Sequence, residues 1–331
     1  MMKSFAIFLS LTYCVLATSR TSAPSGCLIV SKSATSGQYD TVQSAVNALS
    51  TTSTSSQCIW INEGTYEEQV TVPARKAQLI VYGYTTDTAT YADNAVTITS
   101  SLAAADGLSD EDTATLIVLA ENFVLYNVNV ANGYGEGSQA VALAAYQSSG
   151  YYGCSFTGYQ DTLLAETGDQ IYGACYIEGA TDFIFGQHAA AWFEQCDIGV
   201  LDASWGTVTA NGRASSTDPS YYCFNSCNVA AASGQDVPDG AYYLGRPWSE
   251  YARVVFQWTY MSDVINSAGW TEWSSSEPNT EDVLFGEYDN SGAGSEGTRA
   301  SFATKLTAGV SIDTVLGSSY TSYSFYDSSY F

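Results

Sequence analysis

Short segments in which apolar and polar residues alternate recur along the first half of the chain. An apolar residue at every second position is the pattern of a β-strand with one buried face. Glycine, asparagine, aspartate and threonine separate the segments, which indicates turns. The pattern therefore predicts many short strands joined by turns. The apolar pairs are Ile59 and Ile61, Val70 and Val72, Leu79 and Val81, Val96 and Ile98, and Phe123 and Leu125.

One stretch of the chain repeats with a period of 21 residues. Cys154, Cys175 and Cys196 follow one another at this spacing, and an apolar residue stands two positions after each. A repeat of about 20 residues is typical of a solenoid, in which each coil stacks on the one before it. The segments 128–130 and 227–229 carry the same phase. We therefore predict stacked parallel strands with the cysteines in one inward column.

The N-terminal part has a different pattern. A short strand is predicted from Cys27 to Val30. Between Val42 and Leu49, apolar residues stand at i, i+3, i+4 and i+7, which predicts an amphipathic helix. Asp40 and Gln43 resemble a capping box at its start. A helix in this position would cover the open end of the solenoid.

Residues 1–19 have the pattern of a secretory signal peptide. Lys3 is their only charge, an apolar run extends from Phe5 to Leu16, and the small residues 17–19 offer a cleavage site. We therefore expect a secreted, extracellular protein. An N-terminal membrane anchor is the alternative, which the shortness of the apolar run disfavours.

Residues 20–331 are predicted to form a single solenoid domain, because a solenoid grows as one unit. The stretch from Ala103 to Ala114 is acidic and polar, which indicates a surface loop. After Trp273 the chain becomes rich in serine, glycine and acids. From about residue 290 we expect a C-terminal extension that packs back along the solenoid.

The chain is strongly acidic, with 34 Asp and Glu against 10 Lys and Arg and a net charge of −24. Such a surface disfavours nucleic acid and anionic membranes as partners. It would also repel a strongly anionic polymer, but not a neutral or mostly esterified one. Seven cysteines follow the predicted signal peptide. A Cys154–Cys175 disulfide and an inward column of free thiols are both compatible with the sequence.

Two aspartates occupy the same phase of the repeat. Asp161 and Asp182 are 21 residues apart, and stacked strands lie about 4.8 Å apart, so the two carboxyl groups should be neighbours. Like charges at that distance do not both ionise freely, so one pKa should rise while the other group stays an anion. This division suits one acid and one nucleophile. The alternative is that both aspartates are solvated decoration of an acidic surface.

Other polar groups recur near these aspartates. Gln160 precedes Asp161, and Gln139 lies one repeat earlier, so two amide donors could stabilise an oxyanion. Arg246, a rare cation between glycine and proline, could orient a carboxylate through a bidentate bond. A structural ion pair would explain Arg246 equally well.

Several aromatic residues are candidates for stacking on sugar rings, although core packing is the alternative for each. His188 is the only histidine, which excludes a metal site built from several histidines. We expect a structural role for it. The aromatic candidates are Tyr159, Phe183, Trp248 and Trp270.

The candidate residues named above lie in short motifs that resemble those of the pectin methylesterases, a family of carbohydrate esterases. The resemblance covers roughly residues 24 to 305. The run Asp182–His188 and the run Thr209–Arg213 are most similar to fungal members. The resemblance implies an all-β fold, a right-handed parallel β-helix. The matching motifs are Gly64–Glu68, Gln139–Leu143, Gly158–Leu163, Asp182–Gly186, Leu244–Trp248 and Gly269–Trp273.

The resemblance also implies a role for each residue of the site. Asp182 would attack the methyl ester of a galacturonate in pectin, and Asp161 would serve as general acid and then as general base. Gln139 and Gln160 would stabilise the oxyanion. Arg246 would hold Asp182 and contribute with Gln139 to substrate binding, while Trp248 would pack against the sugar. No metal or cofactor is implied. Methyl-esterified pectin is the expected partner, and we expect a monomer.

Two other interpretations keep the solenoid. A pectin lyase or polygalacturonase would cleave the polymer backbone, but the Asp-Asp, Gly-His-Gly and Arg-Ile-Lys signatures of polygalacturonases are absent. A lyase would need basic residues or Ca²⁺ near the cleft, and calcium is the harder of these to exclude. A non-catalytic, polymer-binding β-helix is the third interpretation. The complete set of Gln139, Gln160, Asp161, Asp182 and Arg246 disfavours it.

Overall fold

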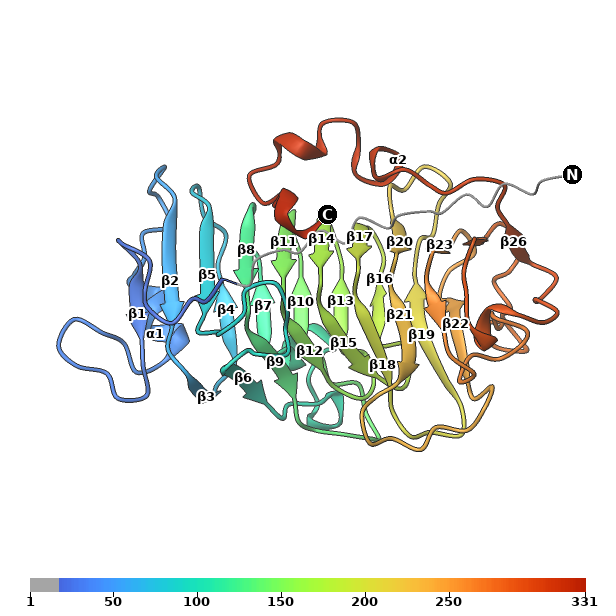
Figure 1. Ribbon diagram of the computed structural model, residues 1–331, viewed down its shortest axis with the longest axis horizontal. Helices are drawn as coiled ribbons and strands as arrows, with labels where there is room; N and C mark the ends of the chain where they lie inside the picture. Colours follow the sequence, from blue (N-terminus) through green and yellow to red (C-terminus); the bar gives the residue numbers. More distant parts are fainter. Residues whose placement is uncertain (1–17) are drawn as a thin grey trace, which may run out of the picture.

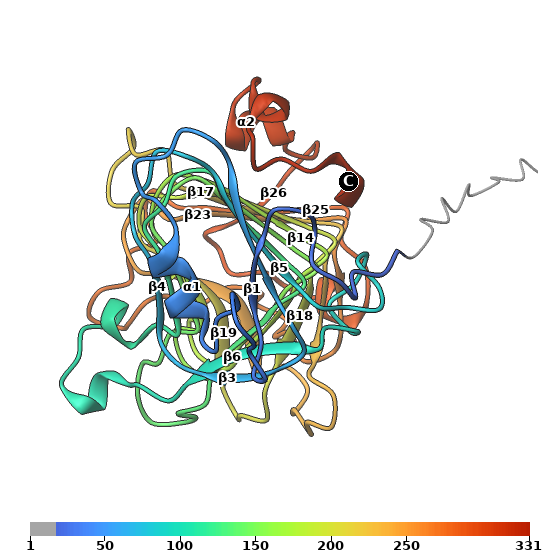
Figure 2. The ribbon, with the colours of Figure 1, turned by 90° about the vertical axis from the view of Figure 1, so that its left-hand side faces the viewer.

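The computed structural model describes residues 18–331, which wind into a parallel β-helix of stacked coils (Figure 1). The predicted signal peptide therefore lies almost entirely outside the described residues. Seen from the N-terminal end, the coils superpose as a three-sided tube (Figure 2). Buried apolar side chains fill the inside of the tube. Within residues 18–331, no helix is both long and apolar enough to cross a membrane.

Three parallel sheets form the sides of the tube, and successive coils pair in register. Leu143, Leu163 and Ile184, for example, stand directly above one another. The 11-stranded sheet contains β1 (Leu28–Val30), β2 (Gln57–Ile61), β5 (Leu79–Gly83), β8 (Phe123–Tyr126), β11 (Ser149–Tyr152), β14 (Asp169–Gly173), β17 (Ala190–Glu194), β20 (Tyr221–Asn225), β23 (Arg253–Gln257), β25 (Leu284–Tyr288) and β26 (Ala303–Lys305).

The other two sheets complete each coil. The 8-stranded sheet contains β3 (Gly64–Glu67), β6 (Val96–Ser100), β9 (Asn129–Asn132), β12 (Ser155–Thr157), β15 (Tyr176–Gly179), β18 (Asp197–Val200), β21 (Asn228–Ala231) and β24 (Tyr260–Met261). The 7-stranded sheet contains β4 (Val70–Val72), β7 (Leu116–Val118), β10 (Leu143–Ala145), β13 (Leu163–Ala165), β16 (Ile184–Gly186), β19 (Gly206–Asn211) and β22 (Tyr242–Pro247).

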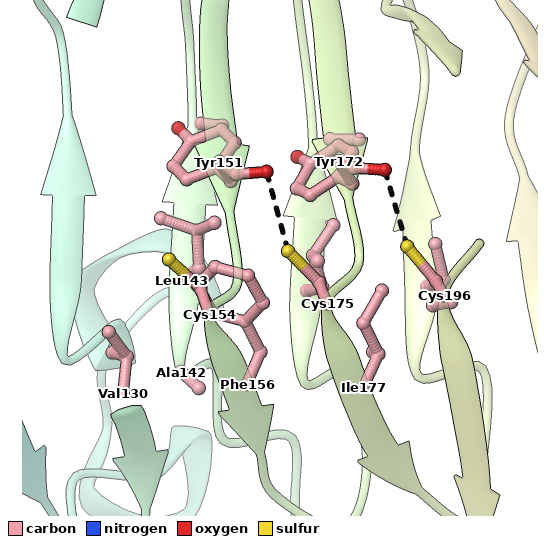
Figure 3. Close-up of a cluster of buried hydrophobic side chains, with 14 of the residues drawn as sticks. Val130, Ala142, Leu143, Tyr151, Cys154, Phe156, Tyr172, Cys175, Ile177 and Cys196 are labelled. Atoms are coloured by element: carbon pink, nitrogen blue, oxygen red, sulfur yellow. Dashed lines mark hydrogen bonds between the residues drawn. The ribbon is translucent and has the colours of Figure 1, made fainter. Parts of the chain in front are cut away.

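The predicted cysteine column lies inside the tube. Cys154, Cys175 and Cys196 are buried and unbridged, so the Cys154–Cys175 disulfide that the sequence left open is not formed. The Cys175 thiol instead donates to the Tyr151 carbonyl at 3.4 Å, and the Cys196 thiol makes the same contact one coil later (Figure 3). The disulfide present in the described residues is Cys27–Cys58, which ties β1 to β2. No signal in the sequence indicated this pair.

Helix α1 (Val42–Ala48) covers the N-terminal end of the tube, as the sequence predicts (Figure 2). The predicted capping box is wrong. Thr41 is the N-cap, and its hydroxyl accepts the Ser44 N–H. The Glu68 carboxylate accepts two further N–H groups of the first turn, at 2.7 and 2.9 Å, which leaves no role for Asp40.

The segment after β26 runs back along the outer face of the 11-stranded sheet (Figure 1). β26 still pairs with β25, so the chain leaves the sheet after Lys305 rather than near residue 290. Phe325 is buried against this outer face. The Tyr152 hydroxyl donates to the Phe325 carbonyl at 2.6 Å. The helical pieces of this segment are α2 (Ile312–Leu316), η4 (Tyr320–Ser322) and η5 (Ser328–Tyr330).

Replacing Phe325 with alanine is expected to lower the free energy of unfolding by about 3 kcal/mol, because a buried aromatic side chain is removed and a cavity remains. Thermal unfolding followed by circular dichroism would measure the change. Phe331→Ala is the matched control, because Phe331 is 41% exposed at the same end of the chain. Equal melting temperatures for the two variants would show that the extension contributes little to stability.

Candidate active site

Asp161 and Asp182 lie at the corner where the 8-stranded sheet meets the 7-stranded sheet. Asp161 stands two residues before β13 and Asp182 two residues before β16, so they occupy the same turn of consecutive coils. Both have left-handed backbones, with φ of 63° and 50°, which aspartate tolerates better than most residues. Both are buried, at 7% and 5% exposure. The stacking that the repeat predicted thus brings two carboxyl groups together.

The Asp182 carboxylate is held by three hydrogen bonds. Arg246 donates to both oxygens, from Nε at 2.9 Å and from a terminal nitrogen at 2.6 Å. The Thr207 hydroxyl donates to Oδ1 at 2.6 Å and also accepts the backbone N–H of Asp182 at 3.0 Å. A bidentate arginine fixes the plane of a carboxylate, and the threonine fixes its rotation. Asp182 is therefore an oriented carboxylate.

Asp161 has a different environment. Its backbone N–H donates to the Thr181 carbonyl at 3.1 Å, but its carboxyl group forms no salt bridge in the described part of the chain. Burial raises the pKa of Asp161 well above its usual value, and the charges of Asp182 and Asp110 raise it further, while Arg246 opposes them. The neighbouring carboxyl groups thus differ in kind: one is an oriented carboxylate, and the other favours its protonated form.

The Arg246 guanidinium itself lies over two indole rings. Its guanidinium carbon lies 4.2 Å from the ring centre of Trp273 and 5.2 Å from that of Trp205. A terminal nitrogen of Arg246 also donates to the Trp273 carbonyl at 3.1 Å. Contact with two aromatic rings favours the guanidinium orientation in which it pairs with Asp182. Neither tryptophan was among the sequence candidates, although Trp273 lies in a matched motif.

Gln139 and Gln160 stack over this corner. Gln139 pairs with Gln160, and Gln160 with Thr181, through parallel backbone bridges. Both glutamines are half-buried at the corner that carries Asp161 and Asp182. The five polar residues that the sequence singled out therefore come together from three consecutive coils and from β22.

The chain is similar to known proteins along most of its length. The pectinesterase family model matches residues 28–328. A pectinesterase of Aspergillus niger is 57% identical over 321 residues, 96% of each chain, and one of Aspergillus aculeatus is 58% identical over 320 residues, also 96% of each chain. The crystal structure of Aspergillus niger pectin methylesterase matches with a TM-score of 0.87 and 47% identity, over 94% of this chain and all of that one. Carrot pectin methylesterase matches with a TM-score of 0.81 and 29% identity, over 92% and 98%.

The chain belongs to the pectinesterase family. The matched region spans the whole β-helix and most of the C-terminal extension. The parallel β-helix that the resemblance implied is thereby confirmed, and so is the assignment of the chain to esterases rather than to lyases or polygalacturonases.

Two of the four predictions of sugar-stacking residues are wrong. Phe183 is completely buried, and Trp270 is 1% exposed. The left-handed turn at Asp182 directs Phe183 into the core, while the Trp270 ring stacks on Phe285 at 4.3 Å, also inside the tube. Both rings close the hydrophobic core and do not reach a ligand. The alternation of apolar residues alone could not reveal this, because it breaks at each corner of the coil.

The other two aromatic candidates lie at the surface of the site region. Trp248 is 36% exposed, and its ring lies 6.3 Å from that of Phe185. Tyr159 is half-buried and immediately precedes Gln160. Phe185 belongs to an apolar patch on the outer face of the 7-stranded sheet, which the sequence analysis missed. This patch consists of Ala114, Val141, Ala144, Leu164, Phe185 and Ala210, with Trp273 packed against it.

His188 lies at the opposite end of β16 from Asp182. Its Nδ1 is 2.6 Å from the Asp218 carboxylate, and the side chain is 48% exposed. Since the whole of β16 separates His188 from Asp182, the histidine does not contact either aspartate. Within residues 18–331, no cluster of three or more His, Cys, Asp or Glu residues could hold a metal ion.

The predicted loop lies at the surface, as expected, and it also flanks the site. It contains two short 3₁₀ helices, η1 (Ala104–Asp106) and η2 (Glu111–Thr113). The Ala104 N–H donates to the Gln139 carbonyl at 2.9 Å, and the Thr113 hydroxyl accepts the Val141 N–H at 3.0 Å. These bonds fix the loop beside the glutamines, close enough for Asp110 to influence Asp161. Its acidic composition indicated exposure, but not this location.

Replacing Thr207 with valine is expected to lower kcat about 10- to 100-fold, because valine keeps the shape but removes a hydrogen bond to a charged group. KM should change little, since Thr207 is fully buried beneath Asp182. Steady-state methanol release would separate the two constants. Thr207→Ser is the control and should retain most of the activity, because it keeps the hydroxyl. An unchanged kcat in the valine variant would show that the threonine does not position Asp182.

Proposed function

We propose that the chain hydrolyses methyl esters of galacturonate residues in pectin through a covalent intermediate on Asp182. The observation that supports this most strongly is the contrast between two adjacent carboxyl groups. Asp182 is held as an oriented carboxylate by Arg246 and Thr207, whereas Asp161 forms no salt bridge with any described residue and has a raised pKa. A nucleophile and a general acid require this combination at one pH.

In the first step, a carboxylate oxygen of Asp182 attacks the ester carbonyl carbon of the bound sugar. The carbonyl oxygen becomes an oxyanion, and the side-chain amides of Gln139 and Gln160 donate hydrogen bonds to it. As the carbon–methoxy bond breaks, Asp161 gives its proton to the leaving oxygen, and methanol departs. The product is an anhydride between Asp182 and the galacturonate, and Asp161 is left as a carboxylate.

In the second step, a water molecule attacks the galacturonate carbonyl of the anhydride. The Asp161 carboxylate accepts a proton from that water, and the bond to Asp182 breaks. Asp182 is restored as a carboxylate beside Arg246, and the sugar leaves as a free carboxylic acid that ionises in solution. Both aspartates end in their starting states, so the reaction needs only the ester and water.

The polymer would lie along the outer face of the 7-stranded sheet, with Trp248 and Tyr159 in contact with its sugar rings. The apolar patch around Phe185 would form the floor beneath it. Arg246, the cation at the centre of the site, is already paired with Asp182, and Asp110 lies nearby. Neutral, methyl-esterified stretches would therefore bind better than free galacturonate. We further propose that the protein is secreted and acts as a monomer.

The test is methanol release from highly methylated pectin, with viscosity and ultraviolet absorbance followed in the same tube. The proposed reaction gives methanol without an early fall in viscosity and without an unsaturated product. A fall in viscosity or new absorbance without methanol would instead indicate cleavage of the polymer backbone. No methanol, together with unchanged viscosity and unchanged absorbance, would indicate a protein that only binds the polymer.

A further inference from the structure

A second group of exposed aromatic residues lies near the C-terminal end of the solenoid. Trp258 is 46% exposed and Tyr260 is 48% exposed. Trp258 lies in the turn between β23 and β24, and Tyr260 begins β24, where the 11-stranded sheet meets the 8-stranded sheet. Asp161 and Asp182 lie at another corner of the tube, so the width of the 8-stranded sheet separates the two places. No step of the proposed reaction uses these aromatic residues.

The Trp258 ring is held in place although it is exposed. Its backbone is left-handed, with φ of 49°, and its N–H donates to the Tyr288 carbonyl at 3.0 Å. The two rings meet edge to face, with centres 5.3 Å apart. On another side the indole rests on Gly309, where a Cβ would come within 2.3 Å of the ring. A ring fixed on two sides and open elsewhere loses little entropy when a ligand stacks on it.

A cavity adjoins the pair formed by Trp258 and Tyr288. It has a volume of about 660 Å³, and Tyr288 is one of its walls. The rest of the lining is mainly polar and includes Asp289, Asn290, Glu296 and Lys305. An aromatic rim beside a polar hollow of this size matches the chemistry of a sugar, which has apolar ring faces and a polar edge.

The charges of this region favour a neutral sugar. Arg299 lines the cavity but is paired with Glu287 at 2.8 Å, so it cannot attract a carboxylate freely. The remaining charged side chains of the lining are one cation, Lys305, and two anions, Asp289 and Glu296. A free galacturonate would gain no net attraction here, whereas a methyl-esterified residue carries no charge to repel.

We propose that Trp258, Tyr288 and the adjoining cavity bind a second segment of methyl-esterified galacturonan, apart from the segment in the active site. The inference rests on the proposed function, because it takes the same polymer as ligand. Binding at two places raises the effective concentration of ester near Asp182 for a long polymer, but not for a short oligomer. The second site therefore affects polymer binding and leaves the chemistry of the ester unchanged.

The first test uses electrophoretic retardation in gels that contain highly methylated pectin. An Asp182→Asn background keeps the polymer esterified during the run. Adding Trp258→Ala and Tyr288→Ala together is expected to raise the apparent Kd about 3- to 10-fold, since each aromatic contact contributes modestly. Phe331→Ala, which removes an exposed ring elsewhere, should leave the retardation unchanged. With Asp182 intact, the double substitution should leave methanol release from a methyl-esterified trigalacturonate unchanged.

The second test needs no change at the site itself. Hydrogen exchange of the Asp182→Asn protein, with saturating methyl-esterified hexagalacturonate, should slow at residues 287–297 and 303–306. Unchanged exchange at these residues, or unchanged retardation of the double variant, would overturn the proposal. Failure of the proposed function would look different: the unsubstituted protein would release no methanol, whatever the retardation experiment showed.

Discussion

Replacing Asp182 with asparagine is expected to abolish methanol release from methylated pectin, with a loss in kcat of at least about 10⁴-fold. Asparagine keeps the shape of the side chain but cannot form the anhydride with the sugar. Methanol would be measured by a coupled oxidase assay over several hours. The fold should persist, because Asp182 lies at a turn that the flanking sheets hold in place. Arg246 would lose its anionic partner, so a moderate decrease in melting temperature is expected.

The matched control is Asp197→Asn, which alters a hydrogen-bonded aspartate on β18 of the same solenoid. Asp197 accepts hydrogen bonds from Tyr91 and Asn228 and does not contact the active-site residues. This variant should keep nearly full activity. If Asp182→Asn kept a tenth of the original rate while Asp197→Asn behaved normally, Asp182 could not be the nucleophile.

Replacing Asp161 with asparagine is expected to lower kcat by about 10²- to 10⁴-fold, the usual contribution of general acid–base catalysis. The same change should stabilise the protein at neutral pH. Burial and the nearby Asp182 raise the pKa of Asp161 in the folded state well above the ordinary value of 3.8. Folding therefore hinders ionisation of this group, and asparagine removes that penalty.

The sign of the pH effect follows from proton binding. Between pH 3.8 and the raised pKa of Asp161, the folded protein holds a proton that the unfolded chain has released. In that window the free energy of unfolding falls as pH rises, and the loss is complete above the folded-state pKa. Asp161→Asn should thus gain stability over the unsubstituted protein as pH increases. Melting temperatures measured from pH 4 upward would test this, and an asparagine variant with no growing advantage would contradict the account.

The repeat in the sequence was sufficient to predict the stacked coils and the pairing of Asp161 with Asp182. Both follow from a fixed 21-residue period, because equal spacing puts equal positions on top of one another. Arg246 could be placed only through its rarity and the family resemblance. In the structure it contacts two indole rings and Asp182, all of them distant from it in the sequence.

Other features could not be predicted because they depend on where each coil turns a corner. The sequence predicted that Phe183 and Trp270 stack on a sugar ring, but the turns direct both side chains into the core. Thr41 rather than Asp40 caps α1, since Glu68 from another coil supplies the remaining acceptors. The Cys27–Cys58 bridge joins positions that lie outside the repeat. In each case the deciding contact comes from a residue distant in the sequence.

The most direct test of the acyl-enzyme uses Asp161→Asn with an activated substrate, a phenyl ester of trigalacturonate. Phenol leaves without help from an acid, so the first step should proceed, while the second step lacks its base. The account predicts a burst of one phenol per protein molecule, with a trigalacturonyl adduct on the peptide that carries Asp182. The doubly substituted Asp161→Asn, Asp182→Asn protein should show neither. Steady phenol release without a burst, or an adduct on another residue, would contradict the mechanism.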